Sequence, residues 1–325
     1  MIRSVIKGVG GYLPEKVVTN HDLESIVNTN HDWIVQRTGI EQRHMAADDQ
    51  GTSDLAFEAS IKALKHAGLS AEDIDCVIVA TTTPDYTFPA TAAVLQAKLG
   101  MRVGTVAFDV QAVCSGFLYA LSVANSFIVS GQYKRCLVVG AEIMTRLLDW
   151  NDRTTCVLFG DGAGAVILEA EQGNGTLDDF GILSTHLHSD GTNKDLLYTT
   201  GGASTSENVG KIYMLGRDVY KHAVNRLAEV VDETLATNNI TKSDISWLVP
   251  HQANKRIIES TAEKLEMPME RVVLTVSKHG NTSAASVPLA LAHAVEANQF
   301  KSGDLLLLEA MGAGLTWGAA LVRWK

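Results

Sequence analysis

The feature that most constrains the fold of this chain is an order of elements that occurs twice. The segment AEDIDCVIVA around Asp73 corresponds to TKSDISWLVP around Asp244, 171 residues further on. A strand that follows a glycine also repeats, with GQYKRCLVV at Gly131 and GDLLLLEA at Gly303, 172 residues apart. Because these offsets agree to one residue and the order of elements is kept, the pattern indicates a duplicated unit.

A third match aligns Gly162–Gly164 with Gly312–Gly314 at an offset of 150 residues, which implies a shorter connection in the second half. Each half alternates short apolar strands with amphipathic helices, and 325 residues suffice for two such units. We therefore predict an α/β fold of two packed halves, residues 1–175 and 176–325, with the functional groups near their junction.

Cys114 is the first candidate functional residue. It follows an apolar strand in the stretch Val103–Gly131 and precedes a helix that ends at Gly131. The unpaired N–H groups and the dipole of a helix N-terminus favour negative charge, and hence the nucleophilic thiolate. A free cysteine is also often a small buried apolar residue. The local sequence leaves both interpretations open.

Two turns in the second half supply partners for this cysteine. His251, in VPHQAN, lies between an apolar strand and a helix, and Asn281, in KHGNT, precedes another helix. Turns that follow strands are where α/β proteins present reactive groups. The repeat places these turns and the Cys114 turn at the same end of two related halves. We therefore predict that His251 and Asn281 face Cys114.

Composition excludes several other classes of function. A net charge of −10 and a pI near 5.5 argue against general nucleic-acid binding, although a local basic patch could still receive an acidic partner. The N-terminus has no apolar signal segment, and the four cysteines lack zinc-site spacing, so we expect a reduced, cytoplasmic setting. The apolar tract Leu305–Val322 contains Glu309 and several glycines, which predicts strand, turn and strand instead of a membrane span.

Two further motifs have structural interpretations. The segment Val157–Ala170, VLFGDGAGAVILEA, is interpreted as two strands around a tight glycine-rich turn. His186 and His188 have the spacing of strand neighbours, and without a third ligand we expect no metal site. There is no P-loop, and no GxGxxG follows a strand, so nothing supports nucleotide hydrolysis or dinucleotide binding.

The motifs DWIVQRTGI, CSGF, FGDGAGA, VPHQAN, HGNTSAASVP and GAGLTWGAAL span nearly the whole chain. Together they resemble the β-ketoacyl-acyl-carrier-protein synthase III family, the initiating condensing enzymes of type II fatty-acid synthesis. The resemblance implies a thiolase-like fold, a layered α-β-α-β-α sandwich, and a catalytic triad of Cys114, His251 and Asn281. Elongating synthases carry a second histidine where this chain has Asn281.

The resemblance also implies the reaction and the partners. An acyl-CoA primer, acetyl-CoA by default, would condense with malonyl-acyl carrier protein to give a β-ketoacyl-acyl carrier protein, coenzyme A and CO2. Coenzyme A enters as the substrate thioester, and no metal or redox cofactor is expected. Backbone N–H groups of Cys114 and Ala313 would form the oxyanion hole. The family is homodimeric.

Further positions follow from the same resemblance. The coenzyme A contacts implied are Trp33, Arg37, Thr38, Arg153, Gly216 and Asn254. The acyl pocket would contain Met311 and, from the neighbouring subunit, Phe88. The basic residues implied to dock the acidic carrier protein are Lys221, Lys255 and Arg256.

Three departures from the family pattern, Val113, Met311 and Ala313, leave the triad intact, but Met311 leaves the length of the primer open. Two alternative functions share parts of this pattern. A secondary-metabolite condensing enzyme with the same triad would use a CoA-bound extender. A papain-like cysteine hydrolase has a similar separation, 137 residues here, between its cysteine and histidine.

Overall fold

The computed structural model describes residues 1–206 and 208–325. The chain forms two main sheets. The first has the order β1-β7-β6-β4-β5, with bounds Ile2–Tyr12, Asp161–Gln172, Arg135–Ile143, Cys76–Ala80 and Val106–Val110. The second has the order β11-β12-β13-β8, with bounds Trp247–Pro250, Leu305–Gly312, Thr316–Arg323 and Gly181–Ser189.

The two sheets confirm the predicted duplication. In the first sheet β4 and β6 are parallel, and β7 and then β1 continue the sheet, each antiparallel to the strand before it. The second sheet has the same order, with β11 and β12 parallel and β13 and then β8 antiparallel. A parallel bridge between Leu248 of β11 and Val272 occupies the place that β5 has beside β4. The repeated Asp73 and Asp244 are also equivalent. Their carboxylates accept the N–H groups of Ser70 at 2.8 Å and Thr241 at 2.7 Å at the start of matching short turns. The domain boundary at residue 175 stays a prediction.

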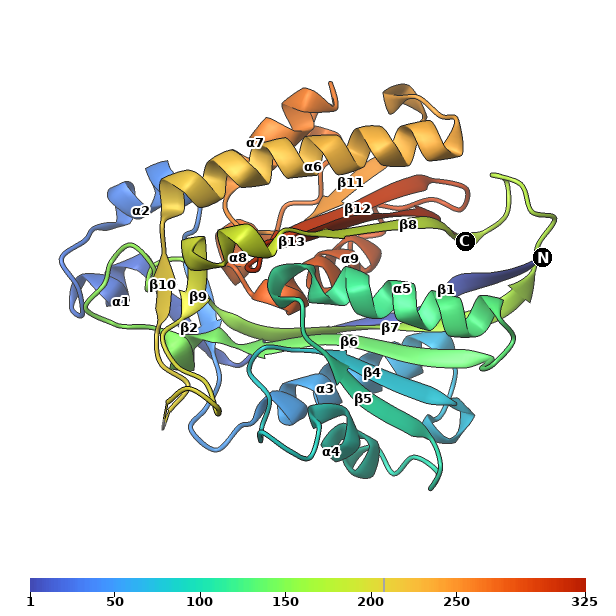
Figure 1. The fold of residues 1–325 in the computed structure, drawn as a ribbon, viewed down its shortest axis with the longest axis horizontal. Coiled ribbons are helices and arrows are strands. Elements are labelled where there is room, and N and C mark those ends of the chain that lie inside the picture. The colour runs from blue at the N-terminus through green and yellow to red at the C-terminus, as the bar shows by residue number, and fades with distance from the viewer. Residues whose placement is uncertain (207) are drawn as a thin grey trace.

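The helices complete a five-layered arrangement (Figure 1). Helices α5 (Gly116–Val129) and α9 (Ser286–Glu296) lie between the sheets, where their apolar residues form one core cluster with both sheets. Helices α3 (Thr52–Ala67) and α4 (Thr91–Lys98) cover the outer face of the first sheet. Helices α6 (Gly216–Asn238) and α7 (Lys255–Lys264) cover the second. The predicted layered fold is therefore confirmed.

The remaining short elements gather mostly at one end of the molecule, on the left in Figure 1. They are α1 (Asn20–Glu24), α2 (His31–Thr38), α8 (Val276–His279), β2 (Lys16–Thr19), β3 (Gln42–Met45), β9 (Leu197–Thr199) and β10 (Ile212–Met214). Single 3-10 turns occur at Ala71–Asp73, Val113–Ser115, Met144–Leu147, Gly191–Leu196, Lys242–Asp244, Met269–Arg271 and Ser283–Ala285.

The prediction of a hairpin within Val157–Ala170 is wrong, because Asp161–Gln172 is one continuous strand, β7. Its glycines allow close packing of the segment around α9 against the first sheet. A Cβ added to Gly164 would lie 2.6 Å from the backbone N of Leu289, and one added to Gly140, its partner on the neighbouring β6, would lie 2.2 Å from the backbone O of Ala284. The glycines let the segment leading into α9, and α9 itself, lie directly on the first sheet.

The third match of the repeat is also wrong in register. Gly164 pairs with Gly140 in the first sheet, and the corresponding pair in the second sheet is Gly318 with Ala310. Gly312–Gly314 instead forms the connection between β12 and β13, so the tract Leu305–Val322 is strand, turn and strand as predicted. Within the described residues, no helix combines the length and apolarity that a membrane crossing requires.

Candidate active site

Cys114 lies on the short 3-10 turn Val113–Ser115, between β5 and α5, and is 4% exposed. Val113, just before it, has a φ of 48°, which is uncommon for a β-branched residue. Strand β12 approaches this turn closely. A Cβ added at Gly312 would lie 2.7 Å from the backbone N of Cys114, so only glycine allows the approach.

Burial, with a smaller contribution from the nearby Glu142 carboxylate, raises the pKa of the Cys114 thiol to about 12. The expectation that a helix N-terminus would favour the thiolate is therefore wrong for the free protein. The physical reason is that α5 begins at Gly116, two residues after the cysteine, and that the surrounding protein removes water from the sulfur. Cys114 is held as a neutral thiol at neutral pH.

His251 follows strand β11 and is buried, and its Nδ1 lies 2.9 Å from the hydroxyl of Ser286. The same hydroxyl oxygen accepts the N–H of Gln252 at 2.6 Å, so its own hydrogen is free to donate to Nδ1. We infer from this network that the ring proton resides on Nε2. Burial lowers the pKa of His251 to about 4, which keeps the ring neutral at neutral pH.

Asn281 is held on both its main chain and its side chain. Its N–H donates to the carbonyl of Leu158 at 2.9 Å, and its carbonyl accepts the N–H of Gly160 at 3.0 Å. The side-chain Oδ1 accepts the N–H of Ser283 at 2.9 Å. With Oδ1 occupied in this way, the amide Nδ2 is the group that Asn281 presents to the space in front of Cys114.

That space is a cavity of about 540 Å³ whose lining includes Cys114, His251 and Asn281. The structure therefore brings the three predicted triad residues together from three separate turns. Other predicted residues line the same cavity: Trp33, Arg37, Thr38, Arg153, Gly216, Asn254, Arg256 and Met311. The cavity is mainly apolar, which suits a ligand with a long chain and few charges.

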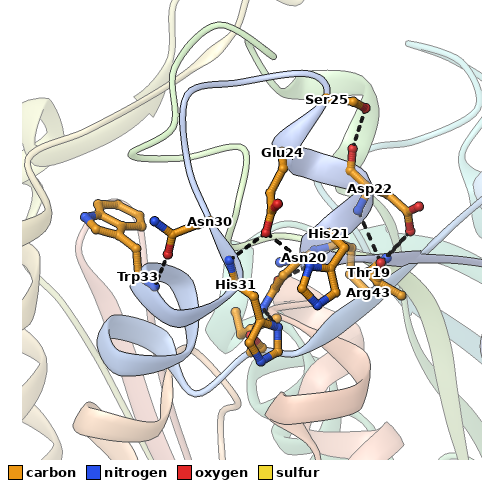
Figure 2. Close-up of polar contacts among 11 residues, drawn as sticks. Thr19, Asn20, His21, Asp22, Glu24, Ser25, Asn30, His31, Trp33 and Arg43 are labelled. Carbon is orange, nitrogen blue, oxygen red and sulfur yellow. Dashed lines mark hydrogen bonds and ion pairs between the residues drawn. The ribbon is translucent and has the colours of Figure 1, made fainter.

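Two arginine side chains from different parts of the chain lie over the ring of Trp33. The guanidinium carbons of Arg37 and Arg153 lie 4.4 and 4.8 Å from the ring centroid. Figure 2 shows how the chain positions this ring: the side chain of Asn30 accepts the Trp33 N–H at 2.8 Å at the start of α2. An aromatic plane beside two arginines can stack on a base and contact phosphate.

The segment before Trp33 is fixed by a second set of contacts (Figure 2). Glu24 accepts the N–H of His31 at 3.0 Å, which ties α1 to the first residue of α2. The buried Arg43 donates to the side chain of Asn20 at 2.9 Å and to the carbonyl of Val157 at 2.6 Å. Helix α2, which carries Trp33, is therefore tied through α1 and the buried Arg43 to Val157, a residue of the cavity lining.

Four predicted residues lie outside this cavity. Phe88 is 84% exposed, and Lys221 and Lys255 are exposed on α6 and α7. Ala313 lines a second cavity of about 400 Å³, which also reaches Cys114. Sequence reasoning missed the apolar lining of this second cavity, which includes Met144, Leu147, Phe159, Leu197 and Ile212. Cys114 thus lies between two cavities.

His186 and His188 both contact the carboxylate of Glu233, at 3.1 and 2.6 Å. They lie on β8 as strand neighbours, in agreement with the structural interpretation. In residues 1–206 and 208–325, no group of three or more His, Cys, Asp or Glu side chains has an arrangement that could hold a metal ion.

Comparison with known proteins decides the family. Family models described as 3-Oxoacyl-[acyl-carrier-protein (ACP)] synthase III and its C-terminal part match residues 108–191 and 235–324. The chain is 63% identical to beta-ketoacyl-[acyl-carrier-protein] synthase III of Rhodospirillum centenum, over 99% of each protein. The chain belongs to the β-ketoacyl-acyl-carrier-protein synthase III family.

Solved structures of this synthase III family agree with that assignment. The crystal structure of the Aquifex aeolicus enzyme aligns with a TM-score of 0.92 at 46% identity and covers 99% of this chain and 100% of its own. The Pseudomonas aeruginosa structure aligns with a TM-score of 0.93 at 42% identity and covers 99% and 98%. The family resemblance predicted from the sequence is confirmed, and the findings do not support the cysteine-hydrolase and secondary-metabolite alternatives.

Proposed function

We propose that this chain condenses an acyl-CoA primer, acetyl-CoA by default, with malonyl-acyl carrier protein and so initiates fatty-acid synthesis. The single observation that carries the proposal is the cavity lined by Cys114, His251 and Asn281 in a chain of the synthase III family. The products are a β-ketoacyl-acyl carrier protein, coenzyme A and CO2. Each residue has a distinct part in one of two half-reactions.

The first half-reaction transfers the acyl group. The Cys114 sulfur attacks the thioester carbonyl, the bond to the coenzyme A sulfur breaks, and the thiol proton ends on coenzyme A. Because burial keeps the thiol neutral, the proton must leave as the C–S bond forms. The oxyanion formed in this step is assigned to the backbone N–H groups of Cys114 and Ala313.

The second half-reaction forms the carbon–carbon bond. Malonyl-carrier protein loses CO2, negative charge develops on its thioester oxygen, and the carbanion then attacks the acyl group on Cys114. A neutral His251 with its proton on Nε2 and the Asn281 Nδ2 are both hydrogen-bond donors suited to that oxygen. Neither has to accept a proton, so the pair acts by electrostatic stabilisation.

The outer part of the cavity is assigned to coenzyme A. Trp33 would stack on the base, Arg37 and Arg153 would meet the phosphates or the base, and Thr38, Gly216 and Asn254 would line the pantetheine chain. Each of these residues borders the same cavity as Cys114. Coenzyme A is thus a substrate group, and the proposal includes no other cofactor.

The carrier protein is assigned to the basic residues around the cavity mouth. Arg256 borders the cavity and lies over the ring of Tyr220 at 5.8 Å, while Lys221 and Lys255 are exposed nearby on α6 and α7. An acidic partner would be attracted to these cations despite the net negative charge of the chain.

The proposal also includes a homodimer in the cytoplasm. Phe88 is largely exposed, as expected for a side chain that enters the acyl pocket of a second subunit, and Met311 would line that pocket from its own chain. The four cysteines are all free, which suits a reducing compartment.

The test separates the two half-reactions. We expect Cys114→Ser to take up no label from radiolabelled acetyl-CoA. We expect Asn281→Ala to be labelled at a rate near that of the wild type but to lose malonyl decarboxylation by about 10²-fold, the effect of removing one oxyanion donor. Full condensation by Cys114→Ser would overturn the proposed mechanism.

A further inference from the structure

Glu142, on strand β6, is a buried carboxylate that neither half-reaction described above uses. Its side chain is fully buried, one residue before the strand ends, and burial raises its pKa to about 7. Placing a carboxylate in the interior is costly unless donors surround it. The fold must therefore provide hydrogen-bond donors that offset the free-energy cost of burying the Glu142 carboxylate.

Four donors surround this carboxylate. The N–H of Thr82 lies 3.0 and 3.2 Å from its two oxygens, and the hydroxyls of Thr83 and Thr81 lie at 2.6 and 3.2 Å. The fourth donor is the hydroxyl of Ser283, at 3.1 Å, which comes from the other half of the chain. Glu142 thus joins the end of β4 to the turn that carries Asn281.

The contact through Ser283 continues to the cavity. Ser283 has a φ of 50°, a left-handed conformation that a serine rarely adopts without support. Its hydroxyl donates to Glu142, and its backbone N–H donates to Asn281 Oδ1 at 2.9 Å. Two consecutive hydrogen bonds therefore connect the buried carboxylate to the amide that faces Cys114.

The contacts on the threonine side make Glu142 a fixed anchor. Thr83 Oγ1, which donates to Glu142, also accepts the N–H of Ile143 at 2.9 Å. The carboxylate is therefore held against the end of its own strand and against the segment that follows β4. A turn tied to this point has less freedom than one held only by its own hydrogen bonds.

We propose that Glu142 is a positioning residue for the decarboxylation half-reaction: it holds Ser283, and through Ser283 it keeps the Asn281 amide aimed into the cavity. The inference rests on the proposed role of Asn281. Glu142 is not part of the cavity lining, so its hydrogen bonds reach Asn281 only through Ser283, while its charge acts directly on the Cys114 thiol. Because acyl transfer to Cys114 does not use the Asn281 amide, loss of this positioning should slow only the second half-reaction.

The test uses Glu142→Gln, which keeps the shape of the side chain but places an NH2 group against donors. We expect radiolabelled acetyl-CoA to acylate Cys114 at a rate within about threefold of the wild type, while release of CO2 from malonyl-carrier protein falls by about 10²-fold. Removing the negative charge near the thiol gives no reason for slower acylation, because that charge disfavours the thiolate.

Asp161→Asn is the matched control. Asp161 is another fully buried strand carboxylate, and it accepts the N–H and hydroxyl of Thr145 at 2.9 and 2.6 Å and the N–H of Ala46 at 2.9 Å. A loss of stability alone should change both half-reactions by the same factor, as we expect for this control. Ser283→Ala removes the hydroxyl that joins Glu142 to the Asn281 turn and carries the test if Glu142→Gln does not fold. Because the same hydroxyl also contacts the Cys114 thiol, the ratio of the two half-reaction rates is the quantity compared.

The inference is overturned if Glu142→Gln or Ser283→Ala lowers both half-reactions equally, or leaves decarboxylation unchanged. The wild-type protein is measured in parallel in both assays. A wild type that accepts acetyl groups but does not decarboxylate malonyl-carrier protein would contradict the proposed function instead. The two failures are therefore distinguishable.

Discussion

Replacing Gly312 by alanine tests whether the approach of β12 to the Cys114 turn matters for catalysis. The added Cβ would lie 2.7 Å from the Cys114 N and 3.2 Å from both the Ala112 O and the Ser115 N. All three are backbone atoms, so no side-chain rotation can relieve the contact. Either the strand or the turn must move by several tenths of an ångström.

This movement has two costs. Overpacking of a well-packed interior typically lowers the free energy of unfolding by about 1–3 kcal/mol. The larger effect falls on catalysis, because the Cys114 N–H is a proposed donor to the oxyanion. Loss of one such donor slows a reaction by about 10²–10³, or about 2.7–4 kcal/mol in the barrier. We expect acyl transfer and condensation to slow together, since both pass through an oxyanion on the carbon bonded to Cys114.

The assay is single-turnover acetylation of Cys114, followed by mass spectrometry of the intact protein, with thermal unfolding measured on the same sample. Gly191→Ala is the matched control, because a Cβ there has no atom within 4 Å. We expect the control to behave as the wild type. A stable Gly312→Ala protein that acetylates at the wild-type rate would refute the assignment of the Cys114 N–H.

Two more predictions follow from the environment of the cavity. Because burial raises the pKa of Cys114 to about 12, the thiolate fraction grows with pH, and alkylation by iodoacetamide should accelerate about tenfold per pH unit between about pH 7 and 10. A rate that is already constant below about pH 8 would contradict the buried, neutral thiol. Replacing the exposed Arg256 by glutamate should raise the KM for malonyl-carrier protein by about tenfold, because like charges at an interface repel, and should affect acetyl-CoA labelling less. Equal effects on both substrates would count against the docking assignment.

The convergence of Cys114, His251 and Asn281 could be predicted because it follows from chain order. Each residue lies in a turn that leads toward a helix, Cys114 and His251 directly after a strand and Asn281 after α8, and the repeat sets those turns at one end of two related sheets. Helix ends also follow local sequence rules: Thr19 and Asp22 form reciprocal capping contacts at the start of α1, and α3 ends before Gly68. The start of α3 departs from these rules, because Gly51 takes the cap position although Thr52 and Ser53 are the residue types that favour it.

Features that depend on distant contacts could not be predicted. The segment FGDGAGA has the composition of a turn, but its Gly162 and Gly164 lie against α9, more than a hundred residues later in the chain. The raised pKa of Cys114 depends on burial by the assembled fold, which opposes the local effect of the helix. Glu142 reaches Thr83 and Ser283, 59 and 141 positions away, so no local pattern marks it.

The second cavity shows a different kind of limit. Leu197 and Ile212 lie on β9 and β10, two three-residue strands in a region where the sequence analysis assigned no element. Such short strands carry too little periodicity to identify. The sequence alone can indicate that apolar residues within a polar segment are buried. Only the folded structure shows that Leu197 and Ile212 line a cavity beside Cys114.

The central claim is that Cys114 carries the acyl group between the two half-reactions. The most direct measurement is to incubate the protein with acetyl-CoA, identify the modified peptide by mass spectrometry, and then add malonyl-carrier protein. We predict one acetyl group on the peptide that contains Cys114, and its loss in step with the release of CO2 and the formation of acetoacetyl-carrier protein. Condensation without an acetylated Cys114, or an acetyl group that malonyl-carrier protein does not remove, would contradict the account.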